Sequence, residues 1–179
     1  MAVLLAVQAA PGRAAEDLSV EAERRGERVD VRARALIAAP AAVVWEVLTD
    51  YEHLPRFIPG IAKSVVRSRD GDRLIVEQSG EARFLIFFFP IEVQLEVTER
   101  PPQWISSRAM AGNVRRMSGR YEIQPDTEHG TVLLRYVGEI EPDFNLPPLI
   151  GVAALRSTAA EQFTAMVAEI ERRAGEAAK

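Results

Sequence analysis

A single long amphipathic helix at the end of the chain constrains the fold more than any other feature of the sequence. The segment Leu149–Arg173 keeps a helical spacing of apolar residues throughout, over roughly 37 Å at about 1.5 Å per residue. Gly175 follows it, and Arg172 and Arg173 stand in its last turn, where cations suit the helix dipole. Such a helix must bury its apolar stripe against another layer of structure. The stripe consists of Val152, Leu155, Ala159, Phe163, Met166 and Ile170.

That other layer is predicted from a series of strand patterns that precede the helix. Val29–Ile37 alternates apolar and polar residues, as a half-buried strand does. Short turns at Asp70–Asp72 and Glu128–Gly130 make neighbouring strands antiparallel. Leu18–Arg28 is weakly patterned and could open a strand, although its charged second half favours a solvated turn. The later strands are predicted at Ile61–Arg69, Leu74–Gly80, Arg83–Thr98, Trp104–Met110, Met117–Ile123 and Val132–Ile140. The fold class is therefore α+β, with an antiparallel sheet of six to seven strands.

Two short helices are predicted between the first strand and the second. Pro40 suits the first turn of a helix, and Val43–Leu48 continues at helical spacing with Trp45 inside it. Asp50 is placed to cap a second short turn over Tyr51–Leu54. The prolines and glycine of the following segment then end the helical structure and lead into the next strand.

The order of these features carries a family resemblance. A strand, Ala39-Pro40, a short helix with a tryptophan, Thr49-Asp50-Tyr51 and a proline-rich segment together resemble the START-like (SRPBCC) superfamily. Within it, the chain is similar to the polyketide cyclase/dehydrase and coenzyme-Q-binding group, from about Val29 to Arg172. The resemblance implies a helix-grip fold, in which a curved sheet wraps around the C-terminal helix. It does not select a ligand, because one scaffold of this kind supports many functions.

Composition excludes several classes of protein. The 179 residues fit one domain, expected over residues 16–175, and a net charge of −4 argues against nucleic-acid binding. The absence of cysteine excludes disulfides and thiolate metal sites. His53 and His129 are isolated, and no Ser-His-Asp pattern or phosphate-binding loop is present, so no catalytic residue, metal ligand or cofactor is predicted.

The first fifteen residues are left out of the predicted domain. Met1–Ala10 is a short apolar run, and Gly12 and Ala14 are small residues of the kind found at a secretory cleavage site. The segment is interpreted as the remnant of a signal peptide, which implies a periplasmic or secreted protein. A frayed N-terminal helix on a cytoplasmic protein is the alternative, since the basic start of a signal peptide is missing.

The uneven volume of the helix stripe predicts a cavity. Ala153, Ala154, Ala159 and Ala160 crowd its first half, and small residues opposite a curved sheet leave room for an apolar pocket of roughly 300–1,000 Å³. The alternative is that the aromatic residues and methionines nearby simply fill a core. Arg156 is a candidate cation in the pocket, unless it points outward. The predicted ligand-binding residues are Phe57, Phe87, Phe89, Trp104, Met110, Met117, Tyr121, Tyr136, Phe144, Leu149, Val152, Leu155, Arg156, Ala159 and Phe163.

Two segments near this pocket leave alternatives open. Phe84–Phe89 is apolar on both faces of a strand, so it needs a packing partner, such as Leu18–Ala22 or a second subunit, or else contacts a membrane. Pro90, at the end of this run, implies a sheet edge or a bulge. The loop Pro142–Pro148 either covers a bound lipid with Phe144 or is a rigid connector.

Three functions follow in order of preference. The first is binding of a hydrophobic small molecule, such as an isoprenoid quinone, a lipid or a polyketide, between helix and sheet. The second is a polyketide cyclase or dehydratase, which requires an acid–base pair that the sequence does not identify. The third is a protein-interaction module, which the acidic balance disfavours. The ligand and the oligomeric state are left undetermined by the sequence.

Overall fold

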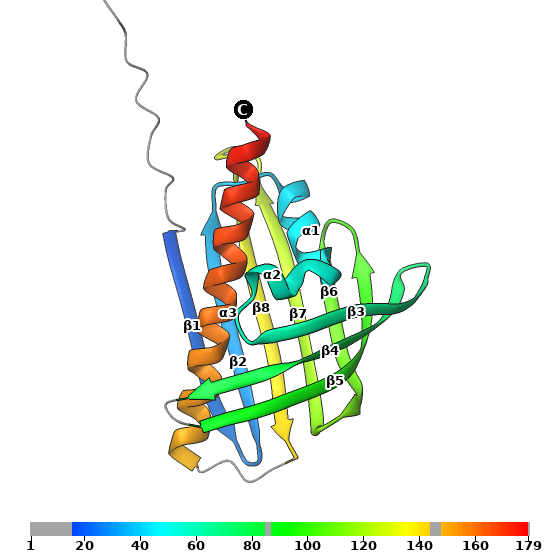
Figure 1. Ribbon diagram of the computed structural model, residues 1–179. Coiled ribbons are helices and arrows are strands. Elements are labelled where there is room, and N and C mark those ends of the chain that lie inside the picture. The colour runs from blue at the N-terminus through cyan, green and yellow to red at the C-terminus, as the bar shows by residue number, and fades with distance from the viewer. Residues whose placement is uncertain (1–15, 85–86, 144–147, 179) are drawn as a thin grey trace, which may run out of the picture.

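An eight-stranded antiparallel sheet curves around the C-terminal helix in the computed structural model, which describes residues 16–84, 87–143 and 148–178 (Figure 1). Within these ranges the side chains of residues 16, 82–84, 87–89 and 148–150 are not described. The helix-grip fold predicted from the sequence is therefore confirmed. The strands are β1 (Glu16–Arg25), β2 (Arg28–Ile37), β3 (Ile61–Asp70), β4 (Arg73–Phe84), β5 (Phe87–Arg100), β6 (Trp104–Gly112), β7 (Val114–Asp126) and β8 (Thr131–Pro142). The helices are α1 (Ala41–Thr49), the 3₁₀ turn η1 (Tyr51–His53), α2 (Leu54–Phe57) and α3 (Pro148–Ala177).

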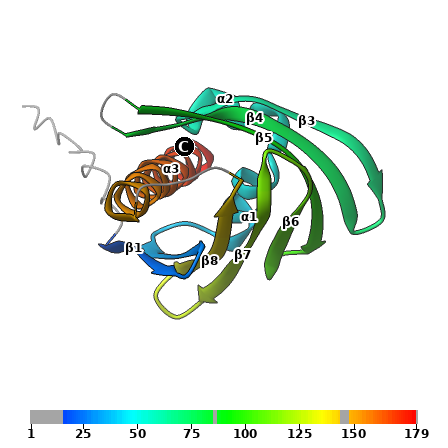
Figure 2. The same cartoon turned by 90° about the horizontal axis from the view of Figure 1, so that it is seen from below.

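The strand order in the sheet is β1-β2-β8-β7-β6-β5-β4-β3, and every neighbouring pair is antiparallel. Helix α3 packs against β1 and β2 near one end of this order and against β4 near the other. Viewed along α3, the sheet passes around the helix from β1 to the β3–β5 side (Figure 2). The concave face of the sheet is thus the face that meets the helix.

The sheet has one strand more than the six or seven predicted. The additional strand is β1, which pairs with β2 from Glu16 opposite Leu36 to Arg25 opposite Arg28, with a shift in register between Glu16 and Ser19. The charged residues that favoured a solvated turn instead form an exposed edge strand, and only the tip at Gly26 is a turn. As a result, the short helices follow the second strand of the chain and not the first.

The predicted strand Arg83–Thr98 is divided by a hairpin. Phe84 ends β4 and pairs with Phe87, the first residue of β5. Pairing of β5 with β6 begins only at Val93. Pro90 therefore lies where β5 has β4 on one side and, among the described residues, no strand on the other, which is the sheet edge that the sequence offered as one of two alternatives. At this edge the side-chain amide of Asn113 binds the backbone of β5. It donates to the Pro90 carbonyl at 2.8 Å and accepts from the Glu92 N–H at 2.9 Å. The side chains of Phe84–Phe89 lie outside the described part of the chain, so the packing partner predicted for them stays a prediction.

The helical elbow between β2 and β3 follows the sequence prediction with two differences. Pro55 does not end the helical structure but lies in the first turn of a further short helix, α2, where a proline is tolerated. Pro40 precedes the first residue of α1, and Asp50 precedes η1. However, Asp50 makes no side-chain capping bond to the turn. Its carboxylate instead contacts His53 Nδ1 at 2.7 Å and Arg173 Nη2 at 2.7 Å, so it joins the elbow to α3.

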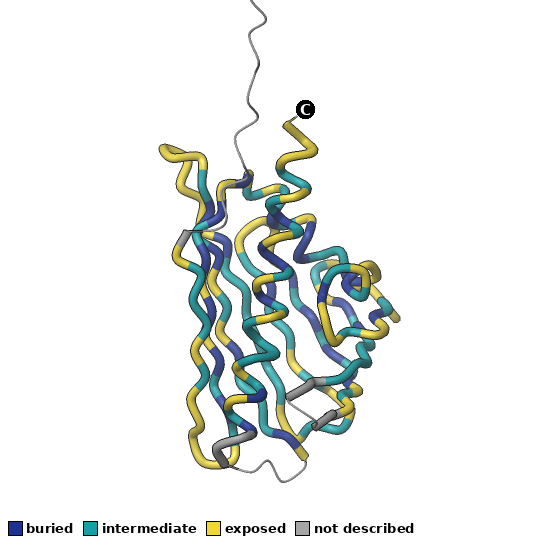
Figure 3. The backbone as a smooth tube through the Cα atoms, turned by 60° about the vertical axis from the view of Figure 1, so that its left-hand side comes forward, coloured by how far each residue is buried: buried dark blue, intermediate teal, exposed yellow. Residues whose placement is uncertain are grey.

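The protein core lies under the second half of α3. Phe163, Met166, Val167 and Ile170 are buried there against buried residues of α1 and the sheet. The first half of the helix is less buried, since of residues 151–162 Gly151 and Ala154 are the buried ones. Exposed positions gather at the hairpin tips and along one side of α3 (Figure 3). The predicted difference between the two halves of the helix is therefore present.

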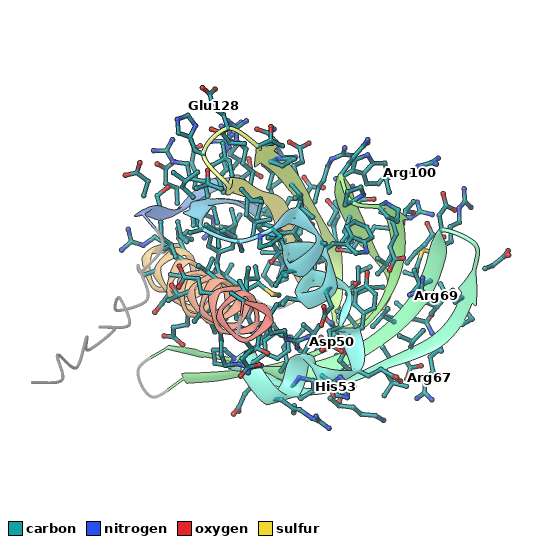
Figure 4. All side chains as sticks on the ribbon, turned by 90° about the horizontal axis from the view of Figure 1, so that it is seen from above. Asp50, His53, Arg67, Arg69, Arg100 and Glu128 are labelled. Carbon is teal, nitrogen blue, oxygen red and sulfur yellow. The ribbon has the colours of Figure 1, made fainter. Side chains whose placement is uncertain are left out.

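Close to the C-terminal end of α3, a cluster of charged side chains ties the helix to the elbow. Arg173 contacts Asp50, Glu46 and Glu169, at 2.7, 3.1 and 2.7 Å. Figure 4 shows Asp50 and His53 together on the elbow beside α3. Arg172 contacts the same Glu169 at 2.7 Å. The two arginines predicted to complement the helix dipole therefore also bind specific carboxylates.

This cluster predicts an acid-dependent part of the stability. Hydrogen bonds from Arg172, together with Arg173, lower the pKa of Glu169 from 4.5 to about 2. A carboxyl with a lowered pKa stabilises the folded state above its unfolded pKa, and this contribution is lost as pH falls towards about 2. We expect Glu169→Gln to lower the free energy of unfolding by about 1 kcal/mol at pH 7. Chemical denaturation at several pH values should show this difference vanish near pH 2.

The matched control for this prediction is Glu161→Gln, which removes an exposed carboxylate from the same helix. Its effect should be small at every pH. Equal pH profiles for the two variants would contradict the role given to Glu169.

A second polar cluster lies inside the fold, between the elbow and the sheet. Glu99 is buried at the end of β5, where its carboxylate accepts hydrogen bonds from the Tyr51 hydroxyl at 2.9 Å and from Arg69 Nη1 at 2.8 Å. Burial, and then the charge of Glu99, raise the pKa of Tyr51. A buried carboxylate is tolerated only with such partners. This cluster fixes η1 on the sheet.

Residues 1–15 lie outside the described part of the chain. The interpretation of this segment as a signal-peptide remnant, and the export that it implies, therefore stay predictions. Within the described residues, no helix is long and apolar enough to cross a membrane.

Candidate functional site

A cavity of about 190 Å³ lies between the first half of α3 and the concave face of the sheet. It lies beside the half of the helix from which the sequence predicted it, but of the four alanines only Ala159 lines its wall, while Ala153, Ala154 and Ala160 do not. Its volume is below the predicted range. Residues from α3, from six strands and from the loop before β3 contribute to its wall. They are Val31, Ala33, Gly60, Ile61, Gln78, Ser79, Gly80, Glu81, Ile91, Val93, Met117, Tyr121, Tyr136, Gly138, Glu139, Ile140, Leu155, Thr158, Ala159, Gln162 and Phe163.

Two glycines facing each other across β7 and β8 form the floor beneath one tyrosine. Gly119 pairs with Gly138. A Cβ atom on Gly138 would lie 2.3 Å from the Tyr136 hydroxyl oxygen, and one on Gly119 would lie 2.7 Å from it. Both distances are too short for atoms that are not bonded, so any side chain at either position would displace Tyr136. The bare backbone at this pair therefore lets the Tyr136 ring lie along the sheet.

Tyr121 stands directly across the strand pair from Tyr136, and the two rings are in contact. Their centroids are 4.7 Å apart with an interplanar angle of 42°. Burial raises the pKa of Tyr136 to about 12, and it also raises the pKa of Tyr121. Both phenols are therefore neutral at ordinary pH and can donate a hydrogen bond.

The remaining polar groups on the wall differ in how well they are satisfied. Gln78 donates from Nε2 to the buried Ser64 hydroxyl at 3.3 Å. Glu139 accepts from Arg28 at 3.2 Å and from Ser118 at 3.4 Å, on the outer side of the sheet. Among the described residues that line the cavity, none is a lysine or an arginine. The site therefore offers a neutral ligand hydrogen bonds but offers an anion no countercharge.

One side of the cavity continues into a groove between α3 and the loop before β3. The groove is formed by residues 59–62 together with Glu81, Thr158 and Glu161, and it shares Gly60, Ile61, Glu81 and Thr158 with the cavity. Gln162 spans the boundary, donating from Nε2 to the Pro59 carbonyl at 3.1 Å. The part of a long ligand that does not fit in the cavity would lie in this groove.

The structure brings six of the predicted ligand-binding residues to the cavity wall. They are Met117, Tyr121, Tyr136, Leu155, Ala159 and Phe163. Phe57 and Val152 are half-buried but do not line the cavity, and Phe57 lies near Arg173, whose guanidinium carbon is 5.6 Å from the ring centroid. Phe144, and the side chains of Phe87, Phe89 and Leu149, lie outside the described residues.

Three of the predicted positions are corrected. Trp104 and Met110 lie on the outer face of the sheet, because Ile105 and Ala109 of the same strand take the inward positions. The Arg120 guanidinium lies 4.1 Å from the centre of the Trp104 ring, and Met110 is 53% exposed. Arg156 is exposed on α3 and is therefore not a cation inside the cavity.

Sequence reasoning missed the wall supplied by the loop before β3 and by β4 and β5. Ile91 and Val93 lie in the predicted strand Arg83–Thr98, but they are not among the predicted ligand-binding residues. Gly119 and Gly138 carried a signal, since both are glycines inside strand patterns and such glycines often mark a close approach. Among the described residues, no group of histidine, aspartate and glutamate is placed to hold a metal ion.

Comparison with known proteins identifies the family. The sequence profile described as "Polyketide cyclase / dehydrase and lipid transport" matches residues 37–167, well over half of the chain. A search of curated proteins found no match.

Solved structures with the same fold include enzymes and lipid-transfer proteins. An aromatase/cyclase named Zhui from a Streptomyces species has a TM-score of 0.69 and 16% identity, covering 85% of this chain and 96% of its own. A STAR-related lipid transfer protein from Xanthomonas axonopodis has a TM-score of 0.63 and 14% identity, covering 87% and 99%. A START superfamily protein from Mycobacterium smegmatis has a TM-score of 0.63 and 18% identity, covering 82% and 97%. At these identities the likeness concerns the fold alone. Through the match to its profile, the chain belongs to the polyketide cyclase / dehydrase and lipid transport family.

Proposed function

We propose that the protein binds and carries a hydrophobic small molecule in the cavity between α3 and the sheet. The observation that supports this most strongly is the apolar hollow at the place where the helix supplies Ala159 and Thr158 in place of larger residues. Protein interiors are densely packed, so an empty space of this size costs stability. A ligand that fills the space would offset that cost.

The size and shape of the site narrow the ligand. An engineered apolar cavity of about 150 Å³ holds one benzene molecule, so about 190 Å³ suits one ring or a small fused pair. A longer molecule would place its remainder in the groove beside Gly60 and Thr158. An isoprenoid quinone, a lipid with a compact neutral end and a small polyketide all meet this description.

A cyclase or dehydratase function is the second candidate. The observation that favours it is that an acidic residue, Glu81, contributes to the lining of the cavity together with Tyr121 and Tyr136. A catalytic acid works best with a pKa near the working pH, and the pKa of Tyr136 is raised to about 12. Binding without chemical change is therefore the better-supported function.

Native mass spectrometry of the freshly purified protein, before and after extraction with organic solvent, tests this proposal. We expect a population heavier than the bare chain that is lost on extraction, with an apolar compound recovered in the solvent. Recovery of substrate-like polyketides in unchanged form after incubation with the protein would favour carriage over catalysis. A bare chain that also shows no thermal shift with any quinone, neutral lipid or aromatic ketone would contradict the proposal.

A further inference from the structure

We propose that Tyr136 and Tyr121 form a hydrogen-bonding pair that selects an uncharged ligand with a carbonyl oxygen on a flat ring, such as a quinone or an aromatic ketone. This inference rests on the proposed function, because it names the chemistry that the same cavity would recognise. It concerns two residues whose hydroxyls have no structural task among the described residues.

The hydroxyls of Tyr121 and Tyr136 are unpaired among the described residues and open to the cavity. Neither hydroxyl has a hydrogen-bond partner among the described residues, and both side chains line the cavity. Neither oxygen is among the fully buried side-chain atoms of the described residues that lack a hydrogen-bond partner, which are Arg28 Nε and Glu171 Oε1. The remaining accessible surface of the two tyrosines therefore faces the open space of the cavity. A polar group in such a place is normally satisfied by a ligand or by water.

The third tyrosine of the chain provides a contrast. Tyr51 is buried too, but its hydroxyl donates to Glu99 at 2.9 Å. One of the three tyrosines, Tyr51, is therefore part of the interior of the fold. The other two, Tyr121 and Tyr136, are in contact with each other on the cavity wall. Phenylalanine would supply the same apolar ring, so the two cavity hydroxyls require a reason of their own.

The charges around the cavity restrict the ligand to an uncharged molecule. No lysine or arginine lines the described wall, and the carboxylate of Glu139 is held on the outer side of the sheet by Arg28 and Ser118. A ligand carboxylate or phosphate would therefore be buried without a countercharge, at high cost. A carbonyl oxygen accepts a hydrogen bond and carries no charge, so it matches neutral phenol donors.

The shape of the cavity wall favours a flat ring. The Tyr136 ring lies along the bare backbone of the Gly119–Gly138 pair, and the Tyr121 ring meets it at 42°. Aromatic rings pack well against other rings at such tilted angles. Apolar side chains, including Ile91, Val93 and Leu155, complete the wall. A flat ring that places its oxygen at the two phenols would use all of these surfaces.

The test compares a ring ketone with its hydrocarbon analogue. Menadione and methylnaphthalene share a fused pair of rings and differ in the carbonyl oxygens. Because the chain contains no cysteine, menadione cannot form a thiol adduct with it. Isothermal titration calorimetry gives the affinity of each probe for the wild type, for Tyr136→Phe, for Tyr121→Phe and for the double variant.

We expect the wild type to prefer menadione and each single variant to lose about three- to tenfold in menadione affinity, the value of one hydrogen bond. Methylnaphthalene affinity should stay within about twofold, and the double variant should lose the preference. Tyr51→Phe is the matched control: it removes a buried tyrosine hydroxyl outside the cavity and should leave the ratio of the two affinities unchanged.

The outcomes separate this inference from the proposed function. If neither probe binds the wild type, or if both bind equally to the wild type and Ala159→Phe, the cavity itself is not a binding site. If both probes bind in the cavity but the tyrosine variants keep the wild-type preference, the phenol pair is not the recognition element and the inference is overturned. Equal loss of both probes in the variants would assign the tyrosines a packing role and would also overturn it.

Discussion

Replacing Ala159 with phenylalanine is expected to abolish binding of cavity ligands while leaving the protein folded. Ala159 lines the cavity from α3, opposite the strands that carry Met117 and Tyr136. A benzyl ring of the size that occupies a cavity of about 150 Å³ would fill most of the 190 Å³ available. Affinity for menadione should fall at least about a hundredfold, since the ligand and the new ring compete for one space. The melting temperature should stay the same or rise by a few degrees, because filling a void restores packing contacts.

Ala168→Phe is the matched control for this prediction, because Ala168 is exposed on the same helix. It should leave both affinity and fold unchanged. Calorimetry measures the menadione affinity of the two variants, and thermal unfolding measures their melting temperatures. Unfolding of Ala159→Phe would mean that the alanines stand in a closely packed core, and the carrier function would lose its main support.

Replacing Glu99 with alanine is expected to destabilise the fold by about 3 kcal/mol. The loss has two sources. The Tyr51 hydroxyl would be left buried without an acceptor, and Arg69 would lose the partner that it contacts at 2.8 Å. Because the side chain of Arg69 is 48% exposed, water would partly replace its lost contact, which keeps the expected loss below that of a fully buried pair.

Glu96→Ala provides the comparison on the same strand. Glu96 pairs with the exposed Arg108 at 3.0 Å, and a pair of that kind is worth about 0–1 kcal/mol. Urea unfolding of both variants and the wild type gives the two differences. A loss for Glu99→Ala no larger than that for Glu96→Ala would show that the Tyr51–Glu99–Arg69 cluster does not fix the elbow to the sheet.

The parts of the fold that the sequence predicted are those with a strong repeating pattern. The stripe of α3 and the alternation of β2 each specify one buried face, and each is found as expected. The sequence of β1 has a weaker alternating pattern. β1 is an edge strand, and edge strands are often charged, so Glu23–Arg25 carried the composition of a turn.

The residues of the site were harder to predict, because the inward face of a strand depends on its register. Shifting a strand by one residue exchanges its two faces. Trp104 and Met110 are predicted as an aromatic residue and a methionine near the cavity, but Ile105 occupies the inward position. A bulge between Gln94 and Leu95 alters the pairing of β5 with β6. No local pattern in the sequence reveals such a bulge.

Glu99 illustrates a signal that was present in the sequence but was not used. It has the same parity as Val93, Leu95 and Val97, whose side chains face the core, so the alternation already placed its carboxylate inside. A carboxylate at an inward position must find partners. Its partners come from η1 and β3, however, and only the folded structure brings them together.

The most direct test of the central claim is a methyl-resolved NMR titration of the 19.8 kDa protein with menadione. The account predicts that the methyl resonances of cavity residues shift, namely those of Val31, Ile61, Ile91, Val93, Met117 and Leu155. Methyl groups of the buried core under the second half of α3, such as those of Val44 and Ile170, should shift little. Shifts confined to the exposed Val137 and Met110 on the outer face would contradict the claim that the cavity under α3 is the ligand site.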